Sequence, residues 1–382
     1  MNLSRRRTLA ILGGGTIFAA AGSFGYSVTR PLQSALKPWE IAGTYDDPRM
    51  RALSWAILAP NPHNRQPWKV DLSQPDTVVL YADTDRLLPH TDPFSRQITI
   101  GLGCLLELMQ MAALEEGWEV KTDLFPEGSD VAALDQRPVA ICRFAPTPAA
   151  HDPLFEHVLQ RRSLKEPFDT ARPVAQSDLT QVIETACVTQ AGGSIASDDI
   201  TYFRGLSSKA LMVELETPHT YKESVDLIRI GRREVDANPD GIDFTGPLFE
   251  SLGRLGMFTR DGLIDPDGAM FQQGVNAVLE NTQTAMGHIW LVTPANQRQD
   301  QIAVGRDWLR TNLAVTALGL GMQPLSQALQ EYTEMSAIYA EIHDRLAPNG
   351  GTVQMFSRIG YGPQVPPSPR WTLDAKRIDG IT

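Results

Sequence analysis

Hydrophobic and polar positions along the first part of the chain alternate in ways that predict both strands and helices. A regular apolar spacing from Ile98 to Glu116, closed by Gly117, predicts a long helix. A shorter helix is expected over Pro48 to Leu58, because Asp46 or Asp47 can cap it and proline suits a first turn. Strands are expected where β-branched and apolar residues run together, at Trp68 to Leu72, Thr77 to Ala82 and Val139 to Phe144.

The second part of the chain repeats this mixture with more helix. We expect helices over Asp152 to Arg162, Ser177 to Ala186 and Gln301 to Leu320, and a largely helical stretch over 205–285 with a soft middle at Asn238 to Gly246. Strands are expected at Ile289 to Thr293 and Val353 to Ile359, before a proline-rich tail that begins at Gly360.

The two parts resemble each other. Each has a long helix that ends in glycine before an extended stretch, and two prolines in Ala145 to Ala150 mark a boundary between them. A tandem repeat of one α+β unit describes the chain better than two unrelated domains. We therefore predict a first half over 46–148 and a second over 151–372, preceded by a tether over 31–45.

The N-terminal residues 1–30 look like an export signal. Three arginines, Arg5 to Arg7, precede a stretch from Thr8 to Thr29 without charge, as in a secretory signal. The S-R-R-x-x-L run resembles the twin-arginine motif, although Thr8 and Ala10 depart from it. Cleavage after Ala21 is expected, with an uncleaved membrane anchor as the alternative. The predictions are twin-arginine (Tat) export machinery as a partner and a periplasmic or exported location.

Composition narrows the class of protein. The chain has 382 residues, of which 42% are hydrophobic and 21% charged, as in a folded protein. A net charge of −11 argues against nucleic acid as a partner. Three cysteines without a C-x-x-C pair, and scattered histidines without H-E-x-x-H, disfavour a disulfide framework and a metal site. Hydrolase and dinucleotide-fold motifs are also missing in the required context.

Three segments remain that can carry chemistry. The loop from Ala59 to Trp68 is rich in proline and amides, which suits a heterocyclic ring edge or, alternatively, a rigid loop that buries Trp68. The run Arg161 to Lys165 offers guanidinium groups for a phosphate, or a solvated helix end. Arg358 to Gly362 with the later Pro366 to Arg370 ends a strand in a basic loop.

Together these segments resemble the nitroreductase family of flavin mononucleotide (FMN) enzymes. A-P-N-P-H-N-R-Q-P-W is similar to the family's A-P-S-x-x-N-x-Q-P-W, R-R-S-L-K to its R-R-S-x-R/K, and R-I-G-Y-G with S-P-R to its C-terminal segment. The order differs from ordinary members, where R-R-S comes first and two subunits share each flavin. The resemblance therefore implies a double-length, Acg-like chain that folds as an intramolecular pseudo-dimer of two degenerate nitroreductase-like copies.

The resemblance also implies the residues that bind FMN. Arg161, Arg162 and Ser163, assisted by Arg370, would hold the phosphate and ribityl chain. The opposite half would line the flavin with Pro60, Asn61, His63, Asn64 and Gln66. A P-[IL]-x-G turn of the family, which places a backbone N–H near the reactive ring nitrogen, corresponds to Pro324, Leu325, Ser326 and Gln327, with glutamine in place of glycine.

The implied activity is transfer of hydride or electrons through the flavin to a small acceptor, such as a nitroaromatic or a quinone. No side chain is expected to act as an acid, and the donor could be NAD(P)H, a quinol or a protein. Residues 219–268 are a candidate lid or a plain insertion. Two alternatives stay open: a protein that holds flavin without NAD(P)H-dependent turnover, and a structural protein that has lost it.

Overall fold

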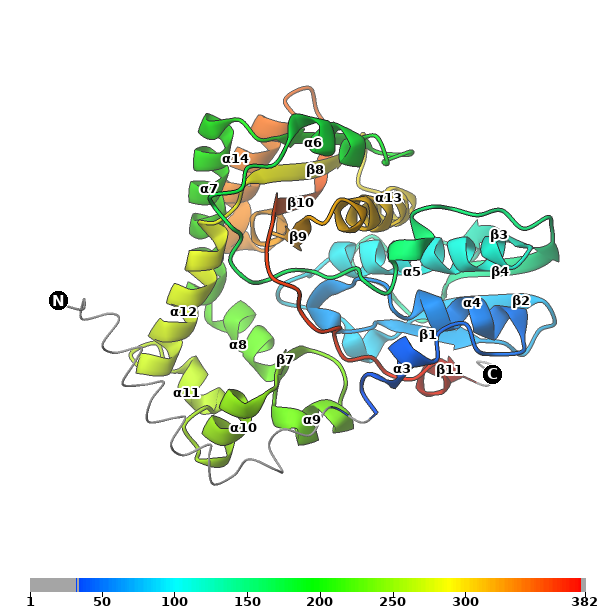
Figure 1. Cartoon of the computed structure of the whole chain (residues 1–382), viewed down its shortest axis with the longest axis horizontal. Coiled ribbons are helices and arrows are strands. Elements are labelled where there is room, and N and C mark those ends of the chain that lie inside the picture. The colour runs from blue at the N-terminus through cyan, green and yellow to red at the C-terminus, as the bar shows by residue number, and fades with distance from the viewer. Residues whose placement is uncertain (1–31, 33, 379–382) are drawn as a thin grey trace.

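The computed structural model describes residue 32 and residues 34–378. The predicted export signal, residues 1–30, lies outside them. The chain is α+β, as predicted, and two sheets flank a central pair of long helices (Figure 1). The described helices are α3 Lys37–Glu40, α4 Pro48–Ala56, α5 Arg96–Glu115, α6 Gln176–Ile183, α7 Ser197–Glu216, α8 Pro218–Asp226, α9 Gly231–Ala237, α10 Pro247–Arg254, α11 Arg260–Ile264, α12 Ala269–Thr282, α13 Arg298–Ala317 and α14 Ser336–Leu346.

The strands form two larger sheets and one small one. The first sheet has the order β11-β1-β2-β4-β3, the second has the order β5-β8-β10-β9, and β6 pairs with β7. Their bounds are β1 Trp68–Asp71, β2 Thr77–Ala82, β3 Trp118–Leu124, β4 Pro138–Pro146, β5 Gln190–Ser194, β6 Ile228–Ile230, β7 Ile242–Phe244, β8 Gly287–Thr293, β9 Gly321–Pro324, β10 Thr352–Gly360 and β11 Arg377–Ile378. Short 3-10 helices lie at η1 Pro62–Asn64, η2 Thr84–Arg86, η3 Phe155–His157, η4 Gln327–Leu329, η5 Thr333–Met335 and η6 Asp374–Lys376.

The two larger sheets share one topology. In the first sheet β2 leads into the long helix α5, which leads into β3 and β4; in the second β8 leads into α13, then β9 and β10. The strands β1, β2, β4 and β3 occupy the same order as β5, β8, β10 and β9, and all neighbouring pairs within these two sets are antiparallel. This correspondence is what a tandem repeat of one α+β unit requires.

The last strand belongs to the opposite half. After β10 the chain runs back across the molecule, and β11 pairs in parallel with β1 through Val70 opposite Arg377 and Asp71 opposite Ile378 (Figure 1). A segment that follows the second half therefore completes the sheet of the first half. The tail predicted from Gly360 is accordingly an ordered crossing segment, at least as far as Ile378.

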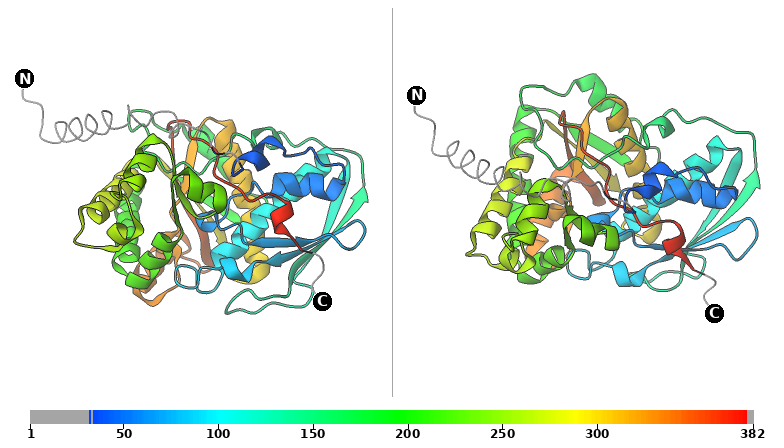
Figure 2. Two further views of the ribbon diagram at one scale, coloured as in Figure 1. Left: turned by 90° about the horizontal axis from the view of Figure 1, so that it is seen from below. Right: turned by 60° about the horizontal axis from the view of Figure 1, so that its bottom comes forward.

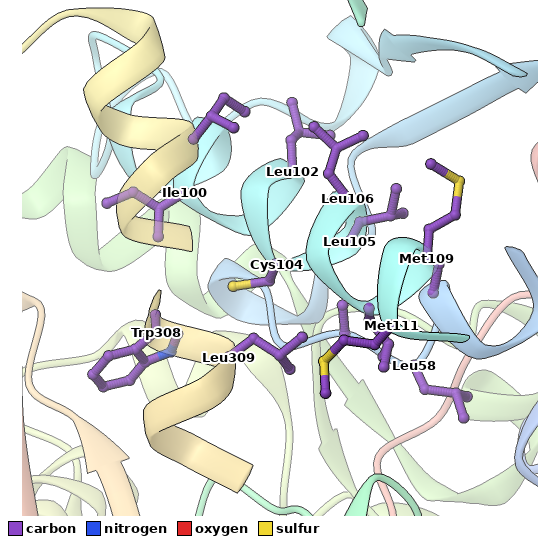
Figure 3. Packing of buried hydrophobic residues seen from close by; sticks show 14 of the residues in the cluster. Leu58, Ile100, Leu102, Cys104, Leu105, Leu106, Met109, Met111, Trp308 and Leu309 are labelled. Atoms are coloured by element: carbon purple, nitrogen blue, oxygen red, sulfur yellow. The ribbon is translucent and has the colours of Figure 1, made fainter. Parts of the chain in front are cut away.

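The halves meet where α5 and α13 cross at van der Waals distance. A Cβ added to Gly103 would lie 2.3 Å from the Ile302 carbonyl oxygen, and one added to Gly305 would lie 2.1 Å from the Ile100 carbonyl oxygen. Glycine is required at both positions because a backbone atom occupies the space of any side chain. Around this crossing the two helices pack apolar side chains, and Figure 3 shows them facing each other there.

A buried arginine at the start of each long helix reaches into the other half. Arg96 is 1% exposed and donates to the Gln354 carbonyl oxygen at 2.7 Å and the Leu329 carbonyl oxygen at 2.6 Å. Arg298 is 4% exposed and donates to the Asp130 carbonyl oxygen at 3.0 Å. The number of residues from the arginine to the glycine at the crossing is the same in both helices. This matching pair of contacts supports a tandem repeat of one α+β unit.

The core position of α5 explains its composition. Among the described residues it is the one helix long and apolar enough to cross a bilayer, yet most of its residues are buried inside the protein. It packs against α4, α13 and β3. A helix that is enclosed on nearly all sides is apolar on nearly all sides.

Most predicted elements are confirmed to within a few residues, and one is wrong. The helix expected over Asp152 to Arg162 is limited to η3, because the residues after it must reach two distant partners. Arg161 contacts the Leu58 carbonyl oxygen, and the Leu164 N–H donates to the Met322 carbonyl oxygen at 2.9 Å. These tertiary contacts override the local helix signal. The helices α3 and α14 and the strands β3, β5, β6, β7, β9 and β11 were not predicted, and α3 lies inside the segment predicted as a tether.

The candidate lid, residues 219–268, is built from α8 to α11 with β6 and β7. Both views of Figure 2 show these helices on the side of the molecule away from the first sheet. Glu223 of α8 ties this insertion to the first half by accepting the Thr91 N–H at 2.9 Å and the Thr91 hydroxyl at 2.6 Å. The predicted soft middle holds β7 rather than a plain loop.

The helix crossing yields a stability prediction. Gly305→Ala should lower the free energy of unfolding by about 3 kcal/mol, because α5 and α13 must separate to admit a methyl group. The matched control is Gly205→Ala in α7, where an added Cβ meets nothing within 4 Å; it should be neutral or stabilising by up to about 1 kcal/mol. Urea unfolding measures both, and equal effects would contradict the proposed crossing constraint.

Candidate functional site

The loop after α4 adopts a conformation that its own amides hold. Asn61 accepts the Gln66 backbone N–H at 2.7 Å through its side-chain oxygen. His63, Asn64 and Gln66 have φ of 45°, 51° and 50°, the left-handed region that non-glycine residues seldom adopt. The loop rests on α5 at Gly101, where an added Cβ would lie 3.1 Å from both Asn61 and Pro62. Pro60 is buried at its start.

The amide side chains of this loop bind protein atoms. Gln66 is fully buried and donates to the Pro239 carbonyl oxygen at 2.7 Å while accepting the Trp371 N–H at 2.8 Å. Asn64 donates to the Pro369 carbonyl oxygen at 2.9 Å and accepts from Arg370. Gln66 therefore helps to hold the loop in place, and its predicted contact with a flavin ring stays a prediction.

Arg370 fastens the C-terminal segment to the end of α4. Its guanidinium donates to the carbonyl oxygens of Ile57 at 3.0 Å and of Leu58 and Ala59 at 3.2 Å each. Cations at a helix C-terminus satisfy carbonyl groups that lack helical partners. Burial, with Arg161 and Arg162 nearby, lowers the pKa of Arg370 to about 9. In this structure its guanidinium braces the loop through these carbonyl oxygens, and its contribution to a phosphate site stays a prediction.

The R-R-S-L-K segment lies beside the same loop in an irregular stretch. Arg161 is buried and donates to the Leu58 carbonyl oxygen at 3.0 Å. Arg162 donates to the Val365 carbonyl oxygen at 3.2 Å, and its guanidinium carbon stands 5.0 Å from the centre of the Trp39 ring. Ser163 is partly exposed between them and Leu164. This segment, the loop and Arg370 thus come together, as the sequence predicts.

The four cations gathered here form no ion pair among the described residues, and the nearest opposing charge is that of Asp243. Within the described residues Arg161, Arg162, Lys165 and Arg370 form no ion pair, although acidic residues outnumber basic ones in the chain. Burial lowers the pKa of Arg161 to about 10 and lowers that of Arg162. Grouped positive charge that the protein itself leaves unpaired favours an anionic ligand.

Lys165 lies within electrostatic range of Asp243 and of His63. Lys165 and Asp243 both keep accessible surface, yet desolvation lowers the pKa of Lys165 and raises that of Asp243, and each charge partly offsets the other's shift. Such a combination is expected of groups that face each other across a narrow gap. Burial first, and then Lys165, lower the pKa of His63 to about 4, so its imidazole is neutral near pH 7.

Asp240 of the insertion fixes the insertion to the loop. This carboxylate, 4% exposed, pairs with Arg65 at 3.1 Å, with Arg229 at 3.0 Å and with Arg86. Arg65 and Arg86 belong to the first half, whereas Arg229 belongs to the insertion. The neighbouring Pro239 accepts the hydrogen bond from Gln66. The insertion therefore lies against the loop through buried charge pairs.

The turn Pro324 to Gln327 follows β9, which lies beside Leu164. Leu325 is buried, and its N–H donates to the Phe356 carbonyl oxygen at 2.9 Å. Ser326 and Gln327 are partly exposed at the start of η4. Arg96 at the start of α5 donates a hydrogen bond to the Leu329 carbonyl oxygen of η4. Gly101 of the same helix packs against Asn61 and Pro62 at η1. The turn and the loop are thus anchored to the same end of α5.

Several residues of this arrangement were missed in the sequence. Lys165 is part of the R-R-S-L-K run and could have been included from the motif alone. Trp39, whose ring lies beside Arg162 and Arg370 at 5.0 and 5.5 Å, sits in what the pattern predicts as a tether. Asp240 and Asp243 lie in the predicted soft middle, and no local pattern marks them.

The described residues form an α+β chain in which Arg161, Arg162, Lys165 and Arg370 gather beside the loop after α4. Sequence comparison supports the nitroreductase family. The chain is 26% identical over 336 residues to a Mycobacterium tuberculosis protein named "Putative NAD(P)H nitroreductase Rv3131", covering 84% of this chain and 88% of that protein. It is 30% identical over 120 residues to a second protein of that organism, named "Putative NAD(P)H nitroreductase acg". That match covers 31% of this chain and 34% of that protein. No family model matches the chain.

Solved structures give a weaker likeness. The FMN and NADPH-dependent nitroreductase NfnB from Sphigopyxis sp. strain HMH is 17% identical with a TM-score of 0.36, and the match covers 60% of this chain and 100% of that chain. A TM-score of this size carries no argument about the site. The functional assignment rests instead on the geometry of the site and on the sequence similarity.

The Asp240 contacts yield a second stability prediction. Asp240→Ala should lower the free energy of unfolding by about 3–5 kcal/mol, because it leaves buried arginines without their counter-ion. Asp344→Ala, at an exposed position of α14, should change it by less than about 0.5 kcal/mol. Chemical denaturation compares the two. If Asp240→Ala unfolds like the control, the insertion is not held by this carboxylate.

Proposed function

We propose that this protein is an FMN-dependent oxidoreductase of the nitroreductase family. Its two halves would form an intramolecular pseudo-dimer with one complete site, as in a double-length, Acg-like chain. The observation that carries the proposal is that Arg161, Arg162 and Lys165 gather beside the loop of the other half without forming an ion pair within the described residues. Relatives named as NAD(P)H nitroreductases add a second, independent support.

The residues present fit the group. The phosphate of FMN is a dianion near pH 7 and needs cations that are not already neutralised. Arg162 and Lys165 keep surface for it, whereas Arg161 and Arg370 brace the loop carbonyls from within. Asn61, His63 and Asn64 are partly exposed on the loop, whereas Gln66 is buried within it.

When bound, FMN would supply hydride or electron transfer from a nicotinamide donor to a small nitroaromatic or quinone-like acceptor. The chain's own residues would bind and orient the reactants. A neutral His63 adds no charge to the loop tip, and Asp243 of the insertion offsets part of the positive field of Lys165 and Arg370. The insertion would limit the access of water and of bulky acceptors from its side.

A second candidate function is flavin binding without NAD(P)H-dependent turnover. The observation that favours it is the set of buried ion pairs at Asp240, which hold the insertion against the loop. Export through residues 1–30, which we also propose, would place the protein away from cytoplasmic NAD(P)H. A quinol or a partner protein would then serve as the donor.

Absorbance of the purified protein separates these functions. We expect flavin bands that bleach when NADPH is added without oxygen and return with a quinone or nitroaromatic acceptor. Bands that persist with NADPH but bleach with a quinol would favour a quinol as the electron donor. A colourless protein that does not take up FMN would overturn the proposal.

The cationic residues provide a sharper prediction. Arg162→Ala and Lys165→Ala should each weaken FMN binding by about 10-fold to 100-fold, the loss expected for a charge-assisted hydrogen bond. Lys209→Ala, an exposed lysine of α7, is the matched control and should bind like the wild type. Quenching of FMN fluorescence gives the affinities. Unchanged binding in both test variants would exclude these residues as the phosphate site.

A further inference from the structure

The segment 369–376 binds the loop after α4 through its two left-handed amide residues. The Pro369 carbonyl oxygen accepts the Asn64 side-chain amide at 2.9 Å, and the Trp371 N–H donates to the Gln66 side chain at 2.8 Å. Asn64 and Gln66 have φ of 51° and 50°, a conformation that persists only where the surrounding structure fixes it. The shape of the loop therefore depends on residues 305 positions further along the chain.

Lys376 of η6 adds a buried ammonium group to these contacts. The residue is 3% exposed, and its Nζ donates to the Gln66 backbone carbonyl oxygen at 2.8 Å. The Asp83 carboxylate stands farther from Nζ, at 4.0 Å, and is paired with Lys69 and Arg86 at 3.0 Å each. The short bond of Lys376 is thus made to the loop and not to a carboxylate.

Positive charge is in excess around Lys376. The charged groups beside it are Arg65 at η1, Lys69 of β1, Asp83 and Arg86 at η2, Asp240 of the insertion, and its chain neighbours Asp374 and Arg377. Asp83 and Asp240 already pair with other cations. Burial first, and then Arg86, lower the pKa of Lys376 to about 7, although Asp83 and Asp240 oppose this shift.

The Gln66 carbonyl oxygen is held from two sides where the loop ends and β1 begins. It accepts the Trp68 N–H at 2.9 Å in addition to the Lys376 ammonium group. The loop residues Asn61, His63 and Asn64 keep exposed surface, whereas Lys376 is buried. Lys376 is therefore placed to act on the loop through its backbone.

We propose that Lys376 is a positioning residue of the proposed FMN site: its ammonium group fixes the Gln66 carbonyl oxygen and, through it, the loop that presents Asn61, His63 and Asn64. The inference rests on the proposed function. It also gives the site a dependence on pH, because Lys376 binds a carbonyl oxygen more strongly as a cation than as a neutral amine.

Lys376→Met and Lys69→Met form a matched pair of variants. Both remove a lysine charge beside Asp83, but Lys69 makes no hydrogen bond to the loop among the described residues. At pH 6, Lys376→Met should bind FMN about tenfold more weakly than the wild type, the loss of one charge-assisted hydrogen bond. Lys69→Met should bind within about twofold of the wild type. Quenching of FMN fluorescence gives the affinities.

The pH profile separates positioning from a merely structural role. As the pH rises through about 7, Lys376 loses its proton and its hold on the loop weakens. The FMN dissociation constant of Lys376→Met, divided by that of the wild type, should therefore fall from about 10 at pH 6 to about 2 at pH 8.5. Titration of the FMN phosphate is common to both proteins and cancels in this ratio. A ratio that stays constant would overturn the proposal.

Amide hydrogen exchange without FMN tests the loop itself. The Gln66 N–H donates to the Asn61 side chain at 2.7 Å, and the Trp68 N–H donates to the Gln66 carbonyl oxygen. Exchange of both amides at pH 6 should be at least about fivefold faster in Lys376→Met than in the wild type, and unchanged in Lys69→Met. Equal exchange in all three proteins would overturn the positioning role.

The two proposals fail in different ways. A wild-type protein that binds no FMN overturns the proposed function and, with it, the role of Lys376 there. FMN binding that Lys376→Met does not weaken, or that Lys69→Met weakens equally, overturns only the positioning role. If Lys376→Met does not fold, the wild type decides: protection of the Gln66 and Trp68 amides, corrected for intrinsic exchange, should fall between pH 6 and pH 8.5, and constant protection overturns the proposal.

Discussion

The close crossing of α5 and α13 is the constraint on which the rest of the structure depends. The backbones of the two helices touch at Gly103 and Gly305. The distance and angle between the two halves are therefore nearly fixed. Both the η1 loop and the η4 turn are attached near the start of α5, by Gly101 and by Arg96. The relative placement of residues from opposite halves is therefore set by packing in the core, at a distance from the site itself.

Reciprocal arginines strengthen that arrangement. Arg96 and Arg298 each carry a guanidinium group into the other half and satisfy carbonyl oxygens there. Buried guanidinium groups that bind carbonyl oxygens are directional, and losing one leaves several acceptors without donors. In a two-subunit protein such bonds would cross a subunit interface. Here one chain contains both partners, so their pairing does not depend on protein concentration.

The sequence predicted the parts of the molecule that depend on local pattern. The long helices and the strands β1, β2, β4, β8 and β10 follow from apolar periodicity, and the three motif segments do come together. The failures have a common cause in distant contacts. The helix predicted over Asp152 to Arg162 does not extend past η3, because Arg161 bonds to Leu58 and Leu164 bonds to Met322. Asp240 has no local signature, because two of its partners, Arg65 and Arg86, lie in the first half of the chain.

The return of the C-terminal segment to β1 has a consequence for how the protein is made. The outer edge of β1 stays without its partner until the ribosome has added residues near Ile378, almost the whole chain. The same holds for the carbonyl groups at the end of α4, which await Arg370. An open strand edge is a place where other chains can pair. The first sheet thus begins to be synthesised early, but its last strand, β11, is added only near residue 378. Between these two events, aggregation or chaperone binding would compete with folding.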